Sequence, residues 1–241
     1  MSMATHASLA LSRFNEPREI GPVLSDLSQG ALFLKVAADI RAAGSNWQTL
    51  SAFKFAMYGL HESEDAALQT VQNRQQILPW LDSSMEVWAG VLRPFRHFGE
   101  ANFLEKDNPG ACFVVTDGPP EDDSPIVIVT SVGWASAEGE AMERIKRFGE
   151  GVTAVRIGMT GLPGLHSQQS FTFPGGLIDD GLTVTFWRNL RAAMDFAYGP
   201  GMHRGQVKIQ RSEPYGDRTS FTRFRVLHSE GSWHGSDPLA P

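Results

Sequence analysis

The sequence predicts an α+β protein in which two ferredoxin-like repeats form an α+β barrel within one chain. Its 241 residues exceed what one small domain needs. The second half has the strand and helix order β-α-β-β-α-β, which is the ferredoxin-like split βαβ pattern. The segment 95–98 (FRHF) is echoed by 224–227 (FRVL), and both segments follow an arginine-bearing strand. The echo indicates a duplication.

The composition is that of an ordinary globular protein, with 41% hydrophobic and 20% charged residues. The formal net charge of −6 gives no electrostatic reason to bind nucleic acid or an anionic membrane. Cys112, the one cysteine, cannot form an internal disulfide and excludes an iron–sulfur cluster built by this chain alone. We therefore expect a cytoplasmic protein with no signal peptide and no transmembrane segment.

Local patterns in the second half place each element of the repeat. Alternating or continuous apolar runs predict strands, and apolar residues three or four apart predict helices. We expect strands at 126–132, 152–159, 166–173 and 218–228, helices at 137–149 and 184–198, and a short helix from about Met202.

The first half is a more degenerate repeat. Apolar spacing predicts a helix over 24–43, a strand within 47–57, a helix near 63–79 and a strand over 86–98. The tract 105–124 is rich in Pro, Gly and Asp, which is typical of a linker. The expected organisation is therefore an N-terminal extension with a helix (1–46), a degenerate first repeat (47–110), a linker (111–124) and a second repeat (125–241).

Several strong motifs of catalysis are absent from the sequence. There is no phosphate-binding loop, dinucleotide fingerprint, HExxH motif or G-x-S-x-G elbow. Seven histidines are present, and no two of them lie i,i+4 on a helix. His203 follows the predicted helix 184–198 and a Gly-Pro-Gly break, which can turn an imidazole toward a groove where it could bind a haem iron. Its spacing alone favours a solvated histidine near a helix start.

Other residues have both a functional and an ordinary interpretation. His166 follows a Gly-rich turn and fits an acid/base group or a turn residue. Gln168 and Ser170 share one strand face, which could meet a ligand or water. Arg156, expected in mid-strand, suits an anionic partner such as a haem propionate, or a solvated surface. Trp187, with Arg188 and Arg191, offers a stacking surface and charge at a helix start.

Four stretches together resemble the spheroidene monooxygenase family of carotenoid-modifying enzymes. The resemblance covers about 120–240 well, 86–109 in part and 1–85 poorly. The family's first repeat is longer, and 174–181 looks inserted here. The stretches are VRIGM-TGLP (155–163), QQSFT (168–172), MDFAY (194–198) with His203 five residues on, and FTRFRV (221–226) followed by GSWHG and DPL.

The resemblance implies a tandem dimeric-α+β-type barrel that holds haem b. It implies that His203, after the helix, is the axial ligand, so that the second repeat binds the haem. The resemblance also implies that the sheet forms the opposite wall, which favours Gln168 and Ser170 as catalytic candidates and Arg156 as a cofactor-binding one. His166, as an acid, is the further catalytic candidate, and Trp187 is the further cofactor-binding candidate. The expected partners are a small or lipophilic organic substrate and an electron donor. Exposed sheet edges also allow a homodimer.

Three functional hypotheses follow from the sequence. The first is a haem-dependent monooxygenase-like oxidoreductase, with a haem-dependent lyase of the aldoxime dehydratase type as its alternative chemistry. The second is a non-catalytic protein that binds haem or another small molecule. The third is a cofactor-free barrel enzyme acting through acid/base groups alone.

Overall fold

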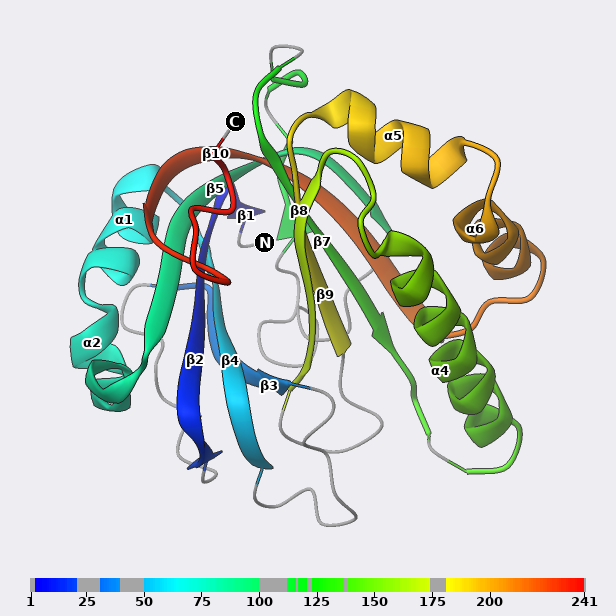
Figure 1. Ribbon diagram of the computed structural model, residues 1–241, viewed down its shortest axis with the longest axis horizontal. Helices are drawn as coiled ribbons and strands as arrows, with labels where there is room; N and C mark the ends of the chain where they lie inside the picture. Colours follow the sequence, from blue (N-terminus) through cyan, green and yellow to red (C-terminus); the bar gives the residue numbers. More distant parts are fainter. Residues whose placement is uncertain are drawn as a thin grey trace.

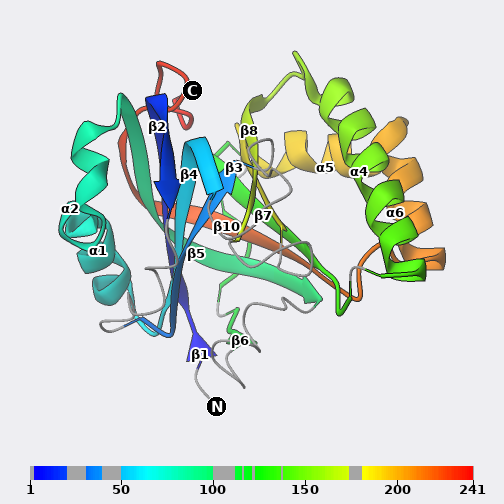
Figure 2. The same cartoon turned by 90° about the horizontal axis from the view of Figure 1, so that it is seen from below.

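A computed structural model describes residues 3–20, 31–39, 50–99, 112–115, 117–120, 123–136, 138–173 and 181–240. Eight strands form a closed barrel, with α1 and α2 on one side and α4, α5 and α6 on the other (Figures 1 and 2). The barrel strands are β2 (His6–Ile20), β3 (Phe33–Asp39), β4 (Leu50–His61), β5 (Glu86–Gly99), β7 (Ile126–Gly133), β8 (Leu165–Thr172), β9 (Gly181–Trp187) and β10 (Arg218–Gly231).

The strand order confirms two ferredoxin-like halves. Around the barrel it is β10-β5-β2-β4-β3-β8-β9-β7, and every neighbouring pair is antiparallel. Each half, read alone, has its fourth, first, third and second strands side by side. Strands β5 and β10, which carry the echoed segments, are the fourth strands and pair with each other. The second seam is short in the described chain, where Ala38 pairs with Thr172 and Asp39 with Phe171.

Large apolar side chains fill the barrel. Every second residue of each strand points inward, as the two-residue period of a strand requires. Trp88 of β5 meets Phe186 of β9 edge to face, with ring centroids 4.8 Å apart. Trp233, from the segment after β10, is buried in the same core cluster. The interior is therefore core, and ligand space has to be sought outside the barrel.

The outer face of the first half is covered closely. The covering elements are α1 (Glu64–Gln72), α2 (Arg74–Ile77) and the 3₁₀ helix η3 (Pro79–Ser83). Ala67 and Val71 of α1 and Leu81 of η3 are buried in one cluster with outward-facing residues of β2, β3, β4 and β5. These helices agree with the helix predicted near 63–79, and Pro79 begins η3 as expected of a residue that cannot continue a helix.

The outer face of the second half carries α4 (Glu140–Met159), α5 (Leu190–Tyr198) and α6 (Met202–Ser212). Asn189 caps α5, since its side-chain oxygen accepts a hydrogen bond from the Ala192 amide at 2.9 Å. In α4 only Ala141 and Met159, near the two ends, are buried. The middle of α4 is thus not packed tightly onto the sheet.

Three predicted elements are wrong. In place of the helix over 24–43, Phe33–Asp39 form β3, whose two faces are both buried, so its apolar run has no strand alternation; residues 21–30 and 40–49 lie outside the described residues. The strand over 152–159 is the end of α4, because Val152, Val155 and Met159 also fit a helical period. The expected helix 184–198 begins only at Leu190, and Val184–Trp187 belong to β9.

Residues expected to form an extension are part of the barrel, since β2 and β3 pair with β4. The tract expected to be a linker is described only in part. Its short strand β6 (Cys112–Phe113) pairs in parallel with β1 (Met3–Ala4). Arg93 pairs with Asp117 at 3.1 Å, and Arg225 donates to the Gly118 carbonyl at 2.8 Å. This described part of the tract is therefore fastened to the barrel.

A buried histidine lies on the outer face of the first half. His61, at the end of β4, is fully buried, and its Nε2 is 2.8 Å from Ser8 Oγ. Gly59 leaves room for this pair, because a Cβ there would lie 2.5 Å from Ser8 Oγ. Burial, together with the neighbouring His6, lowers the pKa of His61 from 6.5 to about 4.

This histidine predicts a loss of stability in mild acid. As the pH falls, His61 of the unfolded chain takes up a proton near pH 6.5, whereas His61 of the folded protein takes one up only near pH 4. The contribution of His61 to the free energy of unfolding is therefore complete above pH 6.5 and is lost as the pH falls toward 4. The loss attributable to His61 is roughly 3 kcal/mol at most. Denaturant unfolding of the wild type and His61→Asn at several pH values measures it. The free energy of unfolding of His61→Asn should depend less on pH over this range than that of the wild type. The control variant His228→Asn, at a half-exposed histidine, should show the pH dependence of the wild type. Equal pH dependence in all three would contradict the prediction.

Candidate functional site

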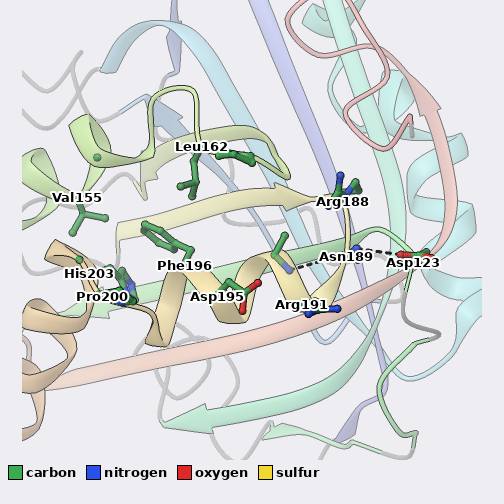
Figure 3. Close-up of a pocket in the computed structure, with 14 residues that line it drawn as sticks. Asp123, Val155, Leu162, Arg188, Asn189, Arg191, Asp195, Phe196, Pro200 and His203 are labelled. Atoms are coloured by element: carbon green, nitrogen blue, oxygen red, sulfur yellow. Dashed lines mark hydrogen bonds between the residues drawn. The ribbon is translucent and has the colours of Figure 1, made fainter.

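A cavity of about 750 Å³ lies among the helices of the second half (Figure 3). Its volume is in the range of small-molecule and cofactor sites. The walls come from the end of α4, the α4–β8 loop, the β9–α5 turn, α5 and the start of α6. The lining residues are Asp123, Val155, Gly158, Leu162, Pro163, Arg188, Asn189, Arg191, Ala192, Asp195, Phe196, Pro200, Gly201 and His203.

His203 is placed in this wall by the break between α5 and α6. Residues 199–201 end α5, and His203 is near the start of α6. Its Nδ1–H donates to the Ala197 carbonyl at 3.2 Å. This bond fixes the tautomer and leaves Nε2 without a hydrogen-bond partner among the described residues. Half-burial lowers the pKa of His203, with the Ala197 bond acting in the opposite direction, so the ring is neutral at pH 7.

An aromatic stack holds the imidazole in place. The Phe196 ring lies 4.6 Å from the His203 ring and 5.4 Å from the Trp187 ring, measured between centroids. Trp187 is itself buried, and its Nε1 donates to Thr185 Oγ1 at 2.9 Å. The stack therefore runs from the sheet through α5 to the cavity. Trp187 is not among the cavity-lining residues and reaches the site through Phe196.

The polar row predicted on β8 lies on the outer face of the sheet, beneath the helices. Phe171 points into the barrel, so Gln168 and Ser170 point outward. Gln168 Nε2 donates to the Arg156 carbonyl of α4 at 3.4 Å, and Ser170 Oγ is 3.1 Å from Thr183 Oγ1. Both polar groups thus have partners within the protein. Neither residue lines the cavity.

The structure brings one of the six predicted site residues, His203, into the cavity wall. His166 is exposed at the start of β8. Arg156 is on α4, not in the middle of a strand, and is half-buried outside the lining. Arg188 and Arg191, expected as charges at a helix start, also line the cavity, and so do Asn189, Asp195 and Phe196, which were not among the predicted site residues. The N-cap pattern of Asn189 before an apolar period was the signal that could have located the helix start and so the cavity.

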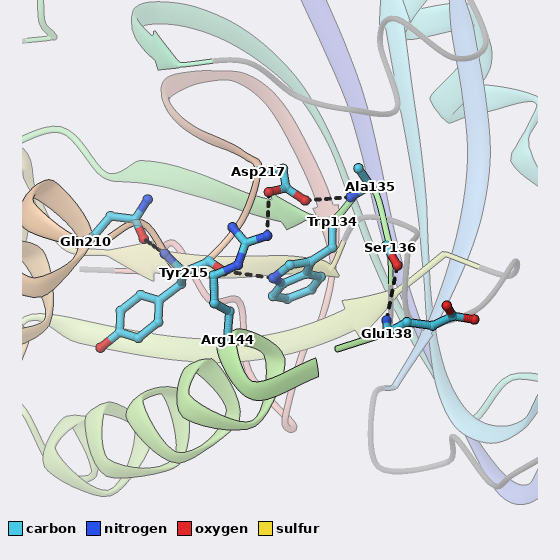
Figure 4. Close-up of polar contacts among 8 residues, drawn as sticks. All are labelled: Trp134, Ala135, Ser136, Glu138, Arg144, Gln210, Tyr215 and Asp217. Carbon is cyan, nitrogen blue, oxygen red and sulfur yellow. Dashed lines mark hydrogen bonds and ion pairs between the residues drawn. The ribbon is translucent and has the colours of Figure 1, made fainter. Parts of the chain in front are cut away.

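A network of hydrogen bonds, here called the polar clamp, holds the start of α4 and the end of α6, which are the ends of these helices away from the cavity (Figure 4). Asp217 accepts hydrogen bonds from the Ala135 amide at 2.7 Å and the Arg144 guanidinium at 2.6 Å. Trp134 Nε1 donates to the Tyr215 carbonyl at 2.8 Å, and the Tyr215 amide donates to Gln210 of α6 at 2.9 Å. Because α6 starts with His203 and is held at its other end, the clamp limits where the imidazole can lie.

Comparisons with known proteins bear first on the fold. No family model matches this chain. Among solved structures, an aldoxime dehydratase in complex with butyraldoxime aligns with a TM-score of 0.53 and 10% identity, covering 94% of this chain and 81% of the other. A second aldoxime dehydratase aligns with a TM-score of 0.54 and 14% identity, covering 92% and 80%. At these identities the likeness shows the fold, which confirms the dimeric α+β barrel expected from the sequence.

The sequence comparison is more specific. The chain is 27% identical over 127 residues to spheroidene monooxygenase of Rhodobacter capsulatus, covering 50% of this chain and 47% of that protein. It is 32% identical over 59 residues to spheroidene monooxygenase of Cereibacter sphaeroides, covering 24% and 18%. The resemblance to spheroidene monooxygenase is confirmed. The chain spans about half the length of the first relative. No helix of the described residues is long and apolar enough to cross a membrane.

The polar clamp around Asp217 leads to a prediction about the stability of the protein. Hydrogen bonds from Ala135 and Arg144 lower the pKa of Asp217, so its stabilising effect is present above pH 3.8 and is lost as the pH falls further. Asp217→Asn removes the charge that Arg144 and Ala135 bind, and should cost about 1–2 kcal/mol at neutral pH. Thermal or denaturant unfolding measures the change. The exposed variant Asp82→Asn is the matched control, and equal stability of the two variants would contradict the prediction.

Proposed function

We propose that the chain is a haem-dependent enzyme that oxygenates a small or lipophilic organic substrate, with His203 as the axial ligand. The observation that carries the proposal is the geometry of His203, whose Nδ1 is bonded to a backbone carbonyl while Nε2 is left for a metal at a cavity. Metal-binding histidines in general hold their second ring nitrogen in this way. The similarity to spheroidene monooxygenase supports oxygenation as the reaction.

The residues around the cavity fit a haem. Eight of the fourteen lining residues are apolar or glycine, and Val155, Leu162 and Phe196 are able to contact a flat macrocycle. The neutral state of His203 suits an iron ligand, because only the unprotonated nitrogen can coordinate. When bound, haem b would supply the redox chemistry of oxygenation, and the protein would set the ligand, polarity and access.

The protein's own groups would then divide the remaining tasks. Ala197, Phe196 and Trp187 would hold the imidazole in one orientation. Gln168 and Ser170, which lie beneath the helices and outside the cavity lining, would reach a bound ligand only after they release the Arg156 carbonyl and Thr183. His166, at the start of β8 and outside the cavity lining, would be the further acid/base candidate. Arg156 would contribute a positive charge beside the cofactor.

A spectrum tests the proposed cofactor. The purified protein, reconstituted with haemin, should give a Soret band, and His203→Ala should lose it or weaken haemin binding by at least tenfold, because an axial bond is removed. His228→Ala changes a histidine on β10 that does not line the cavity, and it should bind haemin like the wild type. A wild type that gives no Soret band, or a His203→Ala variant that binds haemin unchanged, would refute the proposal. Substrate turnover then separates an enzyme from a non-catalytic binder.

The second candidate is a haem-dependent dehydratase, which the two fold neighbours favour. Butyraldoxime is a suitable probe because it is the ligand of one of them. If the chain is an oxygenase, anaerobic incubation of the haemin-loaded protein with butyraldoxime should release no butyronitrile. Nitrile formation that depends on His203 would favour the dehydratase instead, since in this reaction the N–O bond and the aldoxime C–H bond break, the C≡N bond forms and water leaves.

A further inference from the structure

Two guanidinium groups in the cavity wall have no partner in the described part of the chain. Arg188, in the β9–α5 turn, and Arg191, in the first turn of α5, are both exposed. Neither guanidinium group makes a hydrogen bond or an ion pair with a described residue, and the hydrogen bond of Arg188 to the Gly164 carbonyl comes from its backbone amide. Figure 3 shows both at the end of α5 that is opposite His203. The cavity thus has a basic end and an imidazole end.

Four other arginines around the second half are engaged. Arg144 pairs with Asp217 and Arg147 with Glu213, each at 2.6 Å. Arg223 donates to Tyr198 Oη at 3.4 Å, and Arg225 is held by a backbone carbonyl. The guanidinium groups of Arg156 and Arg204 have no such partner among the described residues, but these two residues do not line the cavity. The two that line the cavity have none, and that is where a ligand would be.

The acidic residues of the cavity do not neutralise this pair. Asp123 is hydrogen-bonded by Asn189 Nδ2 at 3.4 Å, and Asp195 is one helical turn beyond Arg191. Neither carboxylate comes within the 4.0 Å of an ion pair with Arg188 or Arg191. The guanidinium groups remain free for an anion with planar, two-oxygen geometry, which is the geometry that arginine binds best.

The length of α5 sets the scale of the ligand. Its nine residues span about 13 Å at 1.5 Å per residue. The walls between the basic end and His203 include Ala192 and Phe196 of α5 and Leu162 of the facing loop. A molecule with a carboxylate at one edge and an apolar body would place its carboxylate on the arginines and its body toward the imidazole.

We propose that Arg188 and Arg191 form a carboxylate clamp that orients the ligand of this cavity. This carboxylate clamp rests on the proposed haem function only in the identity of the molecule that supplies the carboxylate. A haem supplies carboxylates at the edge of its macrocycle, and an amphiphilic substrate would supply one at its end. In both cases the two arginines act by binding and orienting.

Haemin and haemin dimethyl ester separate these sources, since they differ only in the free carboxylates. Soret titrations are compared for the wild type, Arg188→Gln/Arg191→Gln, and the control Lys146→Gln/Lys208→Gln. The control removes the same charge from exposed positions of α4 and α6 outside the cavity. If the macrocycle supplies the carboxylates, the Arg188→Gln/Arg191→Gln variant should bind haemin about tenfold more weakly for each arginine removed. It should bind the dimethyl ester with the affinity of the wild type.

Decanoate and decanol test the substrate as source, by their shift of the thermal unfolding midpoint. Decanoate should stabilise the wild type and the control more than decanol does, and the arginine variant should lose that difference. If the wild type binds no haemin, the proposed function fails, and the decanoate arm alone decides the clamp. An arginine variant that matches the control with haemin and with decanoate would overturn the clamp while leaving the role of His203 intact.

Discussion

Closure of the barrel is the constraint on which the rest of the structure depends. Strands β5 and β10 pair along most of their length, from Gly99 opposite Ser220 to Trp88 opposite Gly231. This pairing joins the two halves and satisfies backbone groups that an open sheet would leave as edges. Once the barrel is closed, its interior has to be filled, and Trp88 against Phe186 fills it with one ring from each half. A filled interior moves ligand binding to the outer faces.

The two outer faces have the same topology but differ in how the helices cover them. In the first half, α1 packs Ala67 and Val71 into a cluster with the strands. In the second half, α4 is longer, and its middle contributes no buried residue. The apolar cluster there is smaller, and the cavity opens beside it. One outer face is thus closely packed, and the other has a cavity among its helices.

Where the sequence patterns failed, the cause was the surroundings of each segment. Phe33–Asp39 are buried on both faces, so the run has neither strand alternation nor a polar helix face, and its helix-like spacing was misleading. Residues Val152–Met159 fit both periods, and only continuity with the preceding turns of α4 selects the helix. Within the site, His203 could be singled out because it follows a Gly-Pro-Gly break. Asn189 had an N-cap pattern that could have located it, whereas Asp195 and Phe196 join the cavity only when α5 packs against the α4–β8 loop.

The amino-acid sequence by itself determined the α+β class, the order of elements in the second repeat and the resemblance to spheroidene monooxygenase. It could do so because the apolar periodicity of each segment, the Gly and Pro residues between segments and the short motifs are local properties of the sequence. The tertiary structure alone decided that the barrel interior is packed, that Gln168 and Ser170 lie outside the cavity lining, and that Arg188, Arg191 and His203 share one wall. Those facts depend on which faces of distant segments meet, and that is settled by barrel closure and helix packing.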